Sequence, residues 1–228
     1  MVEPGDLLAS GRAADVFDQG DGMVLRRYRT DRDCGFEAEV MTWLRVAGFP
    51  VPEVRDATGR DLLMERIAGP TMLADLNARP WMAVSHMRTL ANIQKSLNAL
   101  AAPEWIRPDE RIPVDSSVVH LDLHPMNVIL SSRGPVVIDW TNVRRGDGDF
   151  DAAMSFVLMA AFETHGTQEI IAQQALTRLF RSFRGTRAIR RRLTDAATFR
   201  LQDQNVTAGE RLAIRRLLAR RKTPSTRA

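Results

Sequence analysis

The spacing of apolar residues changes near residue 68, and this change constrains the fold of the 228-residue chain more than any other feature. Before it, short apolar runs alternate with turn residues, so Leu7–Phe17 and Met23–Tyr28 are predicted strands. After it, apolar residues recur at helical spacing over Pro80–Leu100 and in four blocks between Phe150 and Lys222. We therefore expect an α+β fold of two lobes, a β-rich lobe over residues 1–67 and a mainly helical lobe over residues 68–228.

The first lobe also contains one helical pattern and two further strand candidates. Phe36–Val46 has an amphipathic spacing that ends near Gly48, and the strand candidates are Val51–Val54 and Leu62–Met64. In the second lobe, breaks between the four helical blocks are expected near Gly166, Gly185 and residues 206–209.

Composition excludes several classes of protein. A run of about 18 apolar residues is absent, so no membrane span or membrane partner is expected. The first residues lack the basic start and apolar core of a secretion signal, and the single cysteine, Cys34, cannot form an internal disulfide. We expect a cytoplasmic protein.

The positive charge is concentrated at the C-terminal end. From Arg178 onward the chain has 15 Lys and Arg residues but 3 Asp and Glu residues. Such a bias is typical either of nucleic-acid binding or of solvated helix faces. Because the arginines lie among Leu, Ile and Ala at helical spacing and belong to no recognised nucleic-acid-binding module, we favour solvated faces and do not expect a nucleic-acid partner.

The residue types that carry chemistry lie between residues 117 and 139. The apolar runs Ser117–Val119 and Val128–Leu130 flank a loop that holds Asp122, His124 and Asn127, and Asp139 ends a third apolar run. Carboxylate and amide oxygens are ligands that suit Mg²⁺, and a separate carboxylate can accept the proton of a substrate hydroxyl. The spacing His-x-Asp-x-x-x-x-Asn equals that of the protein-kinase catalytic loop, although alone it is a weak signal.

The surrounding sequence resembles a known family. His120-Leu121-Asp122-Leu123-His124-Pro125-Met126-Asn127 is similar to the H-G-D-L-H-P-x-N signature of aminoglycoside phosphotransferases and their choline-kinase-like relatives. Val137-Ile138-Asp139-Trp140 is similar to their metal-binding segment, and Gly146–Ala153 to the segment that follows it. The resemblance covers about residues 7–165 and implies a protein-kinase-like fold.

This resemblance implies roles for the loop residues. Asp122 would be the catalytic base, Asn127 and Asp139 would bind Mg²⁺, and ATP would be the phosphate donor. For His124 there are two interpretations, contact with phosphate or bracing of the loop. Asp151 would either accept backbone N–H groups of the loop or be an ordinary charge at a helix N-terminus.

The resemblance also implies a nucleotide site in the first lobe. Gly11 lies in the loop that would cover the phosphates, and the backbone of Glu65 and Ile67 would contact adenine. Arg26 stands where the family usually has lysine, and an arginine grips phosphate with a different geometry. Glu37 would be the ion-pair partner of Arg26, with Glu39 as the second candidate.

These features predict an ATP- and Mg²⁺-dependent phosphotransferase that acts on a hydroxyl of a small molecule. Aminoglycosides are polycations, and the second lobe carries Arg178, Arg181, Arg184 and Arg187 against the acids Glu163 and Glu169. A metabolite is therefore expected rather than an aminoglycoside. The alternative is a kinase-like nucleotide-binding protein with little or no catalytic activity. The sequence does not indicate the acceptor, the choice of ATP over GTP or the oligomeric state.

Overall fold

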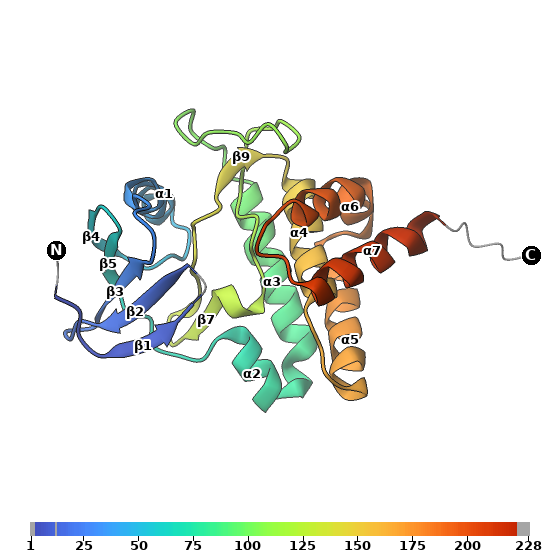
Figure 1. The fold of residues 1–228 in the computed structure, drawn as a ribbon, viewed down its shortest axis with the longest axis horizontal. Helices are drawn as coiled ribbons and strands as arrows, with labels where there is room; N and C mark the ends of the chain where they lie inside the picture. Colours follow the sequence, from blue (N-terminus) through green and yellow to red (C-terminus); the bar gives the residue numbers. More distant parts are fainter. Residues whose placement is uncertain (1–2, 12, 223–228) are drawn as a thin grey trace, which may run out of the picture. The chain divides into compact units, whose positions relative to one another are not determined.

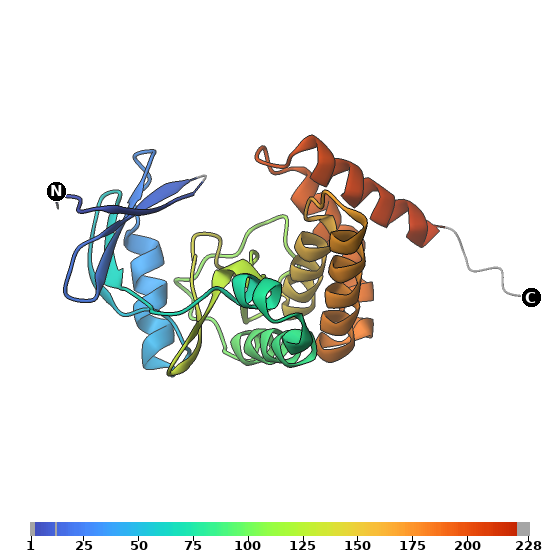
Figure 2. The ribbon, with the colours of Figure 1, turned by 90° about the horizontal axis from the view of Figure 1, so that it is seen from below.

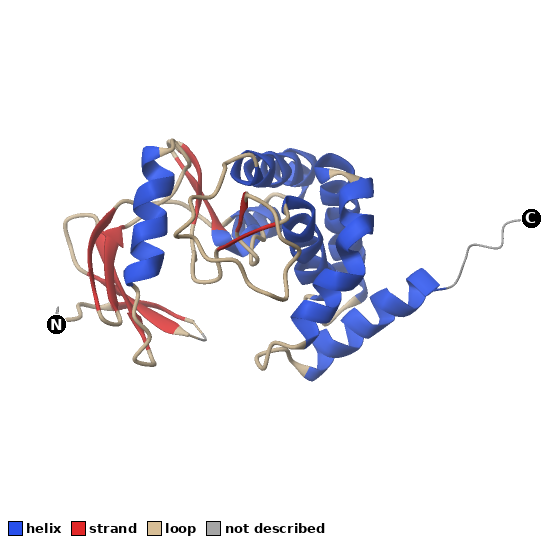
Figure 3. Cartoon of the chain, turned by 90° about the horizontal axis from the view of Figure 1, so that it is seen from above, coloured by secondary structure: helices blue, strands red, loops and turns tan. Residues whose placement is uncertain are grey.

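The structure is a computed structural model that describes residues 3–11 and 13–222. The chain folds into two compact units. The first comprises the chain up to Ala74 together with Met126–Val143, and the second comprises Asp75–Pro125 together with the chain from Arg144 onward. Strands prevail in the first unit and helices in the second (Figure 3). This arrangement confirms the expected α+β class.

The first unit is built on an antiparallel sheet with the strand order β1-β2-β3-β5-β4 (Figure 1). The strands are β1 (Leu7–Ser10), β2 (Ala14–Asp18), β3 (Met23–Tyr28), β4 (Val54–Thr58) and β5 (Asp61–Glu65). The β2–β3 turn has positive φ at Gly20, Asp21 and Gly22. Glycine adopts positive φ at no steric cost. This sheet places β3, and with it Arg26, between β2 and β5.

Helix α1 (Gly35–Val46) buries one face, formed by Glu37, Val40, Met41 and Leu44. Three of these side chains are apolar and join the core, whereas Glu37 is a carboxylate that is only 4% exposed. A buried carboxylate needs a charged or hydrogen-bonding partner. The burial of Glu37 therefore requires a polar partner inside the first unit.

A hairpin of β7 (Val128–Ser131) and β8 (Gly134–Val137) also belongs to the first unit. It is attached by the hydrogen bonds from Leu130 N to Pro70 O and from Val137 N to Pro50 O, both 2.9 Å long. Gly69 approaches the hairpin so closely that an added Cβ would lie 2.2 Å from the Leu130 carbonyl oxygen. The hairpin thus carries the segment after β8, which includes Asp139, into the first unit.

The second unit is a group of packed helices with a small sheet of β6 (Ser117–Val119) and β9 (Arg144–Gly146) (Figure 2). The main helices of this unit come after α2 (Met72–Ala78), which begins at the end of the first unit, and after the short 3₁₀ helix η1 (Pro80–Met82). They are α3 (Ala83–Asn98), α4 (Gly148–Ala161), α5 (Thr167–Arg184), α6 (Thr186–Leu201) and α7 (Ala208–Lys222). Helix α4 is buried along most of its length and contacts the other four helices. None of the helices in the described part of the chain combines the length and apolar character that a membrane span requires.

Most of the predicted elements are present, but the strand predicted over Val51–Val54 lies at Val54–Thr58 (β4), and two further kinds of error occur. The four C-terminal helices and the breaks at Gly166 and Gly185 are confirmed. The single strand predicted over Leu7–Phe17 is wrong, because the chain turns at Gly11 and pairs Leu7 with Phe17. The sequence also missed α2 and β9, which are short and stabilised by their neighbours rather than by their own pattern. The division into lobes at residue 67 stays a prediction.

Candidate active site

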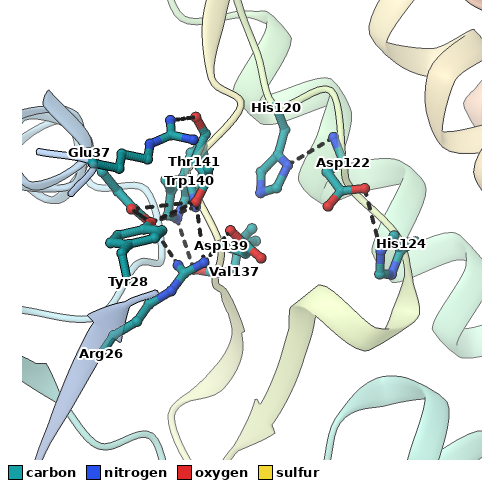
Figure 4. Close-up of polar contacts among 11 residues, drawn as sticks. Arg26, Tyr28, Glu37, His120, Asp122, His124, Val137, Asp139, Trp140 and Thr141 are labelled. Carbon is teal, nitrogen blue, oxygen red and sulfur yellow. Dashed lines mark hydrogen bonds and ion pairs between the residues drawn. The ribbon is translucent and has the colours of Figure 1, made fainter. Parts of the chain in front are cut away.

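In the first unit, Arg26 lies between two carboxylates (Figure 4). Its Nη1 donates to Glu37 Oε1 at 2.9 Å, and its Nη2 donates to Asp139 Oδ1 at 2.8 Å. The three side chains come from β3, from α1 and from the segment after β8, and Asp139 is 113 residues from Arg26 in the sequence. The ion pair predicted between Arg26 and Glu37 is thereby confirmed, and Glu39 is not the partner.

The two carboxylates stabilise the charge of a guanidinium that is only 9% exposed. Burial lowers the pKa of Arg26, but the attraction of Asp139 and then of Glu37 outweighs burial and raises this pKa above its ordinary value. Arg26 is therefore a permanent cation that faces one buried and one partly exposed carboxylate.

Glu37 also fixes the backbone next to Asp139. Its Oε1 accepts the N–H of Trp140 at 3.2 Å, and the indole of Trp140 is buried and donates to Val137 O at 3.1 Å. Asp139 itself has φ of +65°, a conformation that aspartate tolerates better than most residues. Local backbone and side-chain contacts thus direct the Asp139 carboxylate toward Arg26.

Asn127 belongs to the same unit as Asp139. Its carbonyl oxygen accepts the N–H of Ile138 at 3.0 Å, so the residue before Asp139 is tied directly to Asn127. Asn127 is 9% exposed, whereas the side chain of Asp139 is 35% exposed. One carboxylate and one amide oxygen on adjoining segments fit the hard-oxygen ligands that Mg²⁺ takes, with water and phosphate oxygens for the remaining positions.

In the second unit, Asp122 lies in the loop His120–Pro125, here called the Asp122 loop. The Asp122 side chain is 25% exposed, and its Oδ1 lies 3.6 Å from His124 Nε2. The buried His120 accepts the backbone N–H of Asp122 through Nδ1 at 3.2 Å. Figure 4 shows both contacts. A partly exposed carboxylate with a braced backbone is suited to accept a proton from a hydroxyl.

Leu121 of this loop has φ of +66° although it is not glycine. The family signature has glycine at this position, and the positive φ gives the physical reason. Here a leucine that is 5% exposed adopts the same backbone conformation, so its burial offsets a strain of about 1–2 kcal/mol.

Asp151 anchors the Asp122 loop. Its Oδ1 accepts the N–H of Leu121 at 2.8 Å, which confirms the anchoring interpretation over that of an ordinary helix charge. Its Oδ2 accepts Asn98 Nδ2 at 3.0 Å and Gln94 Nε2 at 3.1 Å. Gln94 and Asn98 are four residues apart on α3, and this polar pair on a buried helix face is a signal that sequence reasoning missed.

Arg184 completes this buried network. It donates to Gln94 Oε1 at 3.1 Å, to Asn98 Oδ1 at 2.6 Å and to Gly148 O at 2.9 Å. Burial lowers the pKa of Arg184, although Asp151 attracts its charge. The sequence suggested that the positive charge of Arg184 belongs to a substrate-facing surface. In the structure this charge instead contacts polar groups inside the second unit.

A further arginine lies near Asp122. Arg200, at the end of α6, donates to Glu210 at 2.6 Å and to Asp203 at 2.7 Å. Burial lowers the pKa of Arg200, but the attraction of Glu210, of Asp203 and then of Asp122 raises it overall. Its charge is thus close enough to act on Asp122.

The remaining predicted nucleotide residues lie at or just beyond the ends of strands of the first sheet. Gly11 closes the β1–β2 turn through its N–H to Ala14 O at 2.9 Å. The N–H of Glu65, at the end of β5, donates to Glu53 O at 2.8 Å. Ile67 follows in the connection to Thr71 and is half-buried.

A family model described as the phosphotransferase enzyme family matches residues 6–112 and 95–192. The chain belongs to this family. It is accordingly a phosphotransferase that acts on hydroxyl groups, a small-molecule kinase. A search of curated proteins found no match.

Solved structures of kinases share the fold at low sequence identity. The gentamicin complex of the aminoglycoside phosphotransferase APH(2")-IIa is 14% identical, with a TM-score of 0.64 over 94% of this chain and 88% of that chain. A choline/ethanolamine kinase family protein from Mesorhizobium loti is 17% identical, with a TM-score of 0.57 over 97% and 89%. ADP-bound APH(2'')-Ib is 15% identical, with a TM-score of 0.57 over 95% and 93%. These similarities establish the kinase-like fold.

Proposed function

We propose that this kinase uses ATP and Mg²⁺ to phosphorylate a hydroxyl of a small metabolite. The observation that carries the proposal is the ion-pair cluster in which Arg26 joins Glu37 to Asp139. A fixed cation beside a partly exposed carboxylate is the arrangement that phosphate groups and their divalent ion require. The ADP-bound relative supports a nucleotide as ligand of this fold.

In this proposal each unit supplies one part of the reaction. Asp139 and Asn127 would hold the Mg²⁺, which would neutralise charge on the phosphates when bound, and Arg26 would present its guanidinium to the phosphate oxygens. Asp122 orients the acceptor hydroxyl and accepts its proton, while Asp151 keeps the loop backbone in place. The loop that contains Gly11 would cover the phosphates, with the N–H of Gly11 itself bonded to Ala14 O. For adenine, Ile67 and the carbonyl of Glu65 are the proposed contacts, because the Glu65 N–H is bonded within the sheet.

The charges of the second unit support a neutral or anionic acceptor rather than a polycation. Arg178 and Arg187 are exposed on α5 and α6, and Arg200 acts on Asp122. A cationic aminoglycoside would be repelled by such a field, whereas a carboxylate or phosphate group would be attracted. The Asp203 and Glu210 carboxylates reduce this effect, since both pair with Arg200.

The test is ATP turnover with Mg²⁺ over a panel of hydroxyl compounds that contains neutral, anionic and aminoglycoside acceptors. Asp122→Ala is expected to lower kcat for the best acceptor by about a hundredfold or more. Asp115→Ala is the matched control, because Asp115 is an exposed carboxylate of the same unit. Equal turnover by the two variants would refute the role of Asp122.

The alternative, a nucleotide-binding protein with little or no catalysis, gives a different result. It predicts that Mg²⁺ and ATP raise the melting temperature while no acceptor in the panel is phosphorylated. If Mg²⁺ and ATP at millimolar concentration leave the melting temperature unchanged, both interpretations fail.

A further inference from the structure

Two hydroxyl groups that the family resemblance does not assign lie in the Arg26 cluster. Thr141 Oγ1 lies 3.2 Å from Arg26 Nη2 and 2.8 Å from the hydroxyl of Tyr28. The Tyr28 hydroxyl in turn donates to Glu37 Oε2 (Figure 4). Thr141 is 8% and Tyr28 is 1% exposed, so both hydroxyls are directed into the protein rather than into water.

These contacts fix the plane of the guanidinium. The guanidinium of Arg26 lies over the ring of Tyr28, with Cζ 5.0 Å from the ring centroid. Nη1 of Arg26 donates to Glu37, and Nη2 donates to both Asp139 and Thr141. An arginine held only by Glu37 could rotate about that single hydrogen bond. Because Arg26 has contacts at both Nη atoms and at the face of its guanidinium, it is held in one orientation.

The same contacts act on Asp139. Thr141 follows Asp139 by two residues, so this short segment contacts Arg26 twice, once through a carboxylate and once through a hydroxyl. Arg32 holds the segment from the other side through Nη2 to Thr141 O at 2.8 Å. The direction of the Asp139 carboxylate therefore depends on the Arg26 orientation that Thr141 and Tyr28 maintain.

We propose that Tyr28 and Thr141 are positioning residues, whose hydroxyl groups fix Arg26 so that it holds the Asp139 carboxylate in one orientation for metal binding. The proposal rests on the proposed function, because it concerns the Mg²⁺ that Asp139 would bind. It explains how this chain uses arginine where the family has lysine. A lysine has three donors on a single rotatable nitrogen, so it cannot hold Glu37 and Asp139 through two nitrogens of one rigid plane.

The experiment measures binding of the non-hydrolysable ATP analogue AMP-PNP by calorimetry, with Mg²⁺ and with EDTA. The quantity of interest is the metal gain, defined as Kd in EDTA divided by Kd in Mg²⁺. We expect Thr141→Val and Tyr28→Phe each to lower the metal gain at least about fivefold, equivalent to about 1 kcal/mol. Thr141→Ser keeps the hydroxyl and is expected to recover the gain to within about threefold of the wild type.

Thr42→Val is the matched control, because the Thr42 hydroxyl bonds only within α1, to Ala38 O at 2.8 Å. A Thr141→Val metal gain equal to that of Thr42→Val would overturn the proposal. So would an equal loss of affinity with and without Mg²⁺, because a merely structural role predicts that result. Tyr28→Phe retains the buried ring and decides the question should Thr141→Val not fold.

The wild-type protein separates this inference from the function on which it rests. If the wild type shows no metal gain, the proposed function fails and the inference fails with it. If the wild type shows the gain and the hydroxyl variants keep it, only the inference fails.

Discussion

Replacing Asp151 with asparagine tests the polar network that anchors the Asp122 loop. The carboxylate is fully buried and accepts three hydrogen bonds, from the N–H of Leu121, from Asn98 and from Gln94. Asparagine has the same shape, but one of its two acceptor atoms becomes an NH₂ donor. The NH₂ end of the asparagine side chain, itself a donor, must therefore face another donor.

The network leaves no simple rearrangement. If the new oxygen keeps the Leu121 N–H, the new NH₂ faces the amide nitrogens of Asn98 and Gln94. Those amides cannot flip freely, because their oxygens accept from Arg184 at 2.6 and 3.1 Å. Two hydrogen bonds to a charged acceptor, each worth about 1.5–3 kcal/mol, are lost, and Arg184 loses a compensating charge. We expect Asp151→Asn to lower the free energy of unfolding by about 3–5 kcal/mol.

Urea unfolding followed by circular dichroism measures this difference, with Asp149→Asn as the control. Asp149 lies two residues earlier on α4 and pairs with Arg191 at 2.6 Å, but both side chains are partly exposed. Surface pairs contribute about 0–1 kcal/mol, so this change should be small. If the two variants differ by less than about 1 kcal/mol, the network does not stabilise the loop as described.

Three further changes test separate features. At Leu121, where φ is +66°, Leu121→Gly should be more stable than Leu121→Ala by about 1 kcal/mol in urea unfolding, the reverse of the usual order. Gly69→Ala should cost about 2–4 kcal/mol by the same method, because φ is +140° and the new Cβ meets a carbonyl oxygen, whereas Gly59→Ala, with open space, should cost about 1 kcal/mol. The pKa of Asp61 is lowered by its two hydrogen bonds from Arg27, so Asp61→Asn should destabilise the protein at pH 7 and the difference should shrink as the pH falls below 3.8.

Each of these has an outcome that contradicts it. Alanine as the more stable residue at position 121 would show that the loop backbone is not strained there. Similar costs at Gly69 and Gly59 would argue against the close approach of Gly69 to the hairpin. A cost of Asp61→Asn that grows toward low pH would contradict the sign of the shift, since a lowered carboxyl pKa stabilises the fold only above that pKa.

The sequence indicated local structure and chemistry wherever neighbours in the chain were sufficient. The four C-terminal helices follow from apolar spacing that repeats over several turns and from breaks at Gly166 and Gly185. The Glu37 side chain was predicted as the partner of Arg26 from the family resemblance. The strand predicted over Leu7–Phe17 was too long, because the apolar residues on both sides of Gly11 continue a strand-like pattern.

Tertiary structure decided which polar groups meet inside the fold. Arg184 looked like part of a basic surface, but packing of α5 against α3 turns it onto Gln94 and Asn98. Tyr28 and Thr141 are 113 residues apart, and no local pattern predicts that their hydroxyls meet. Spacing along the chain reports the face of one helix or strand, whereas a buried hydrogen bond between distant segments depends on how those segments pack.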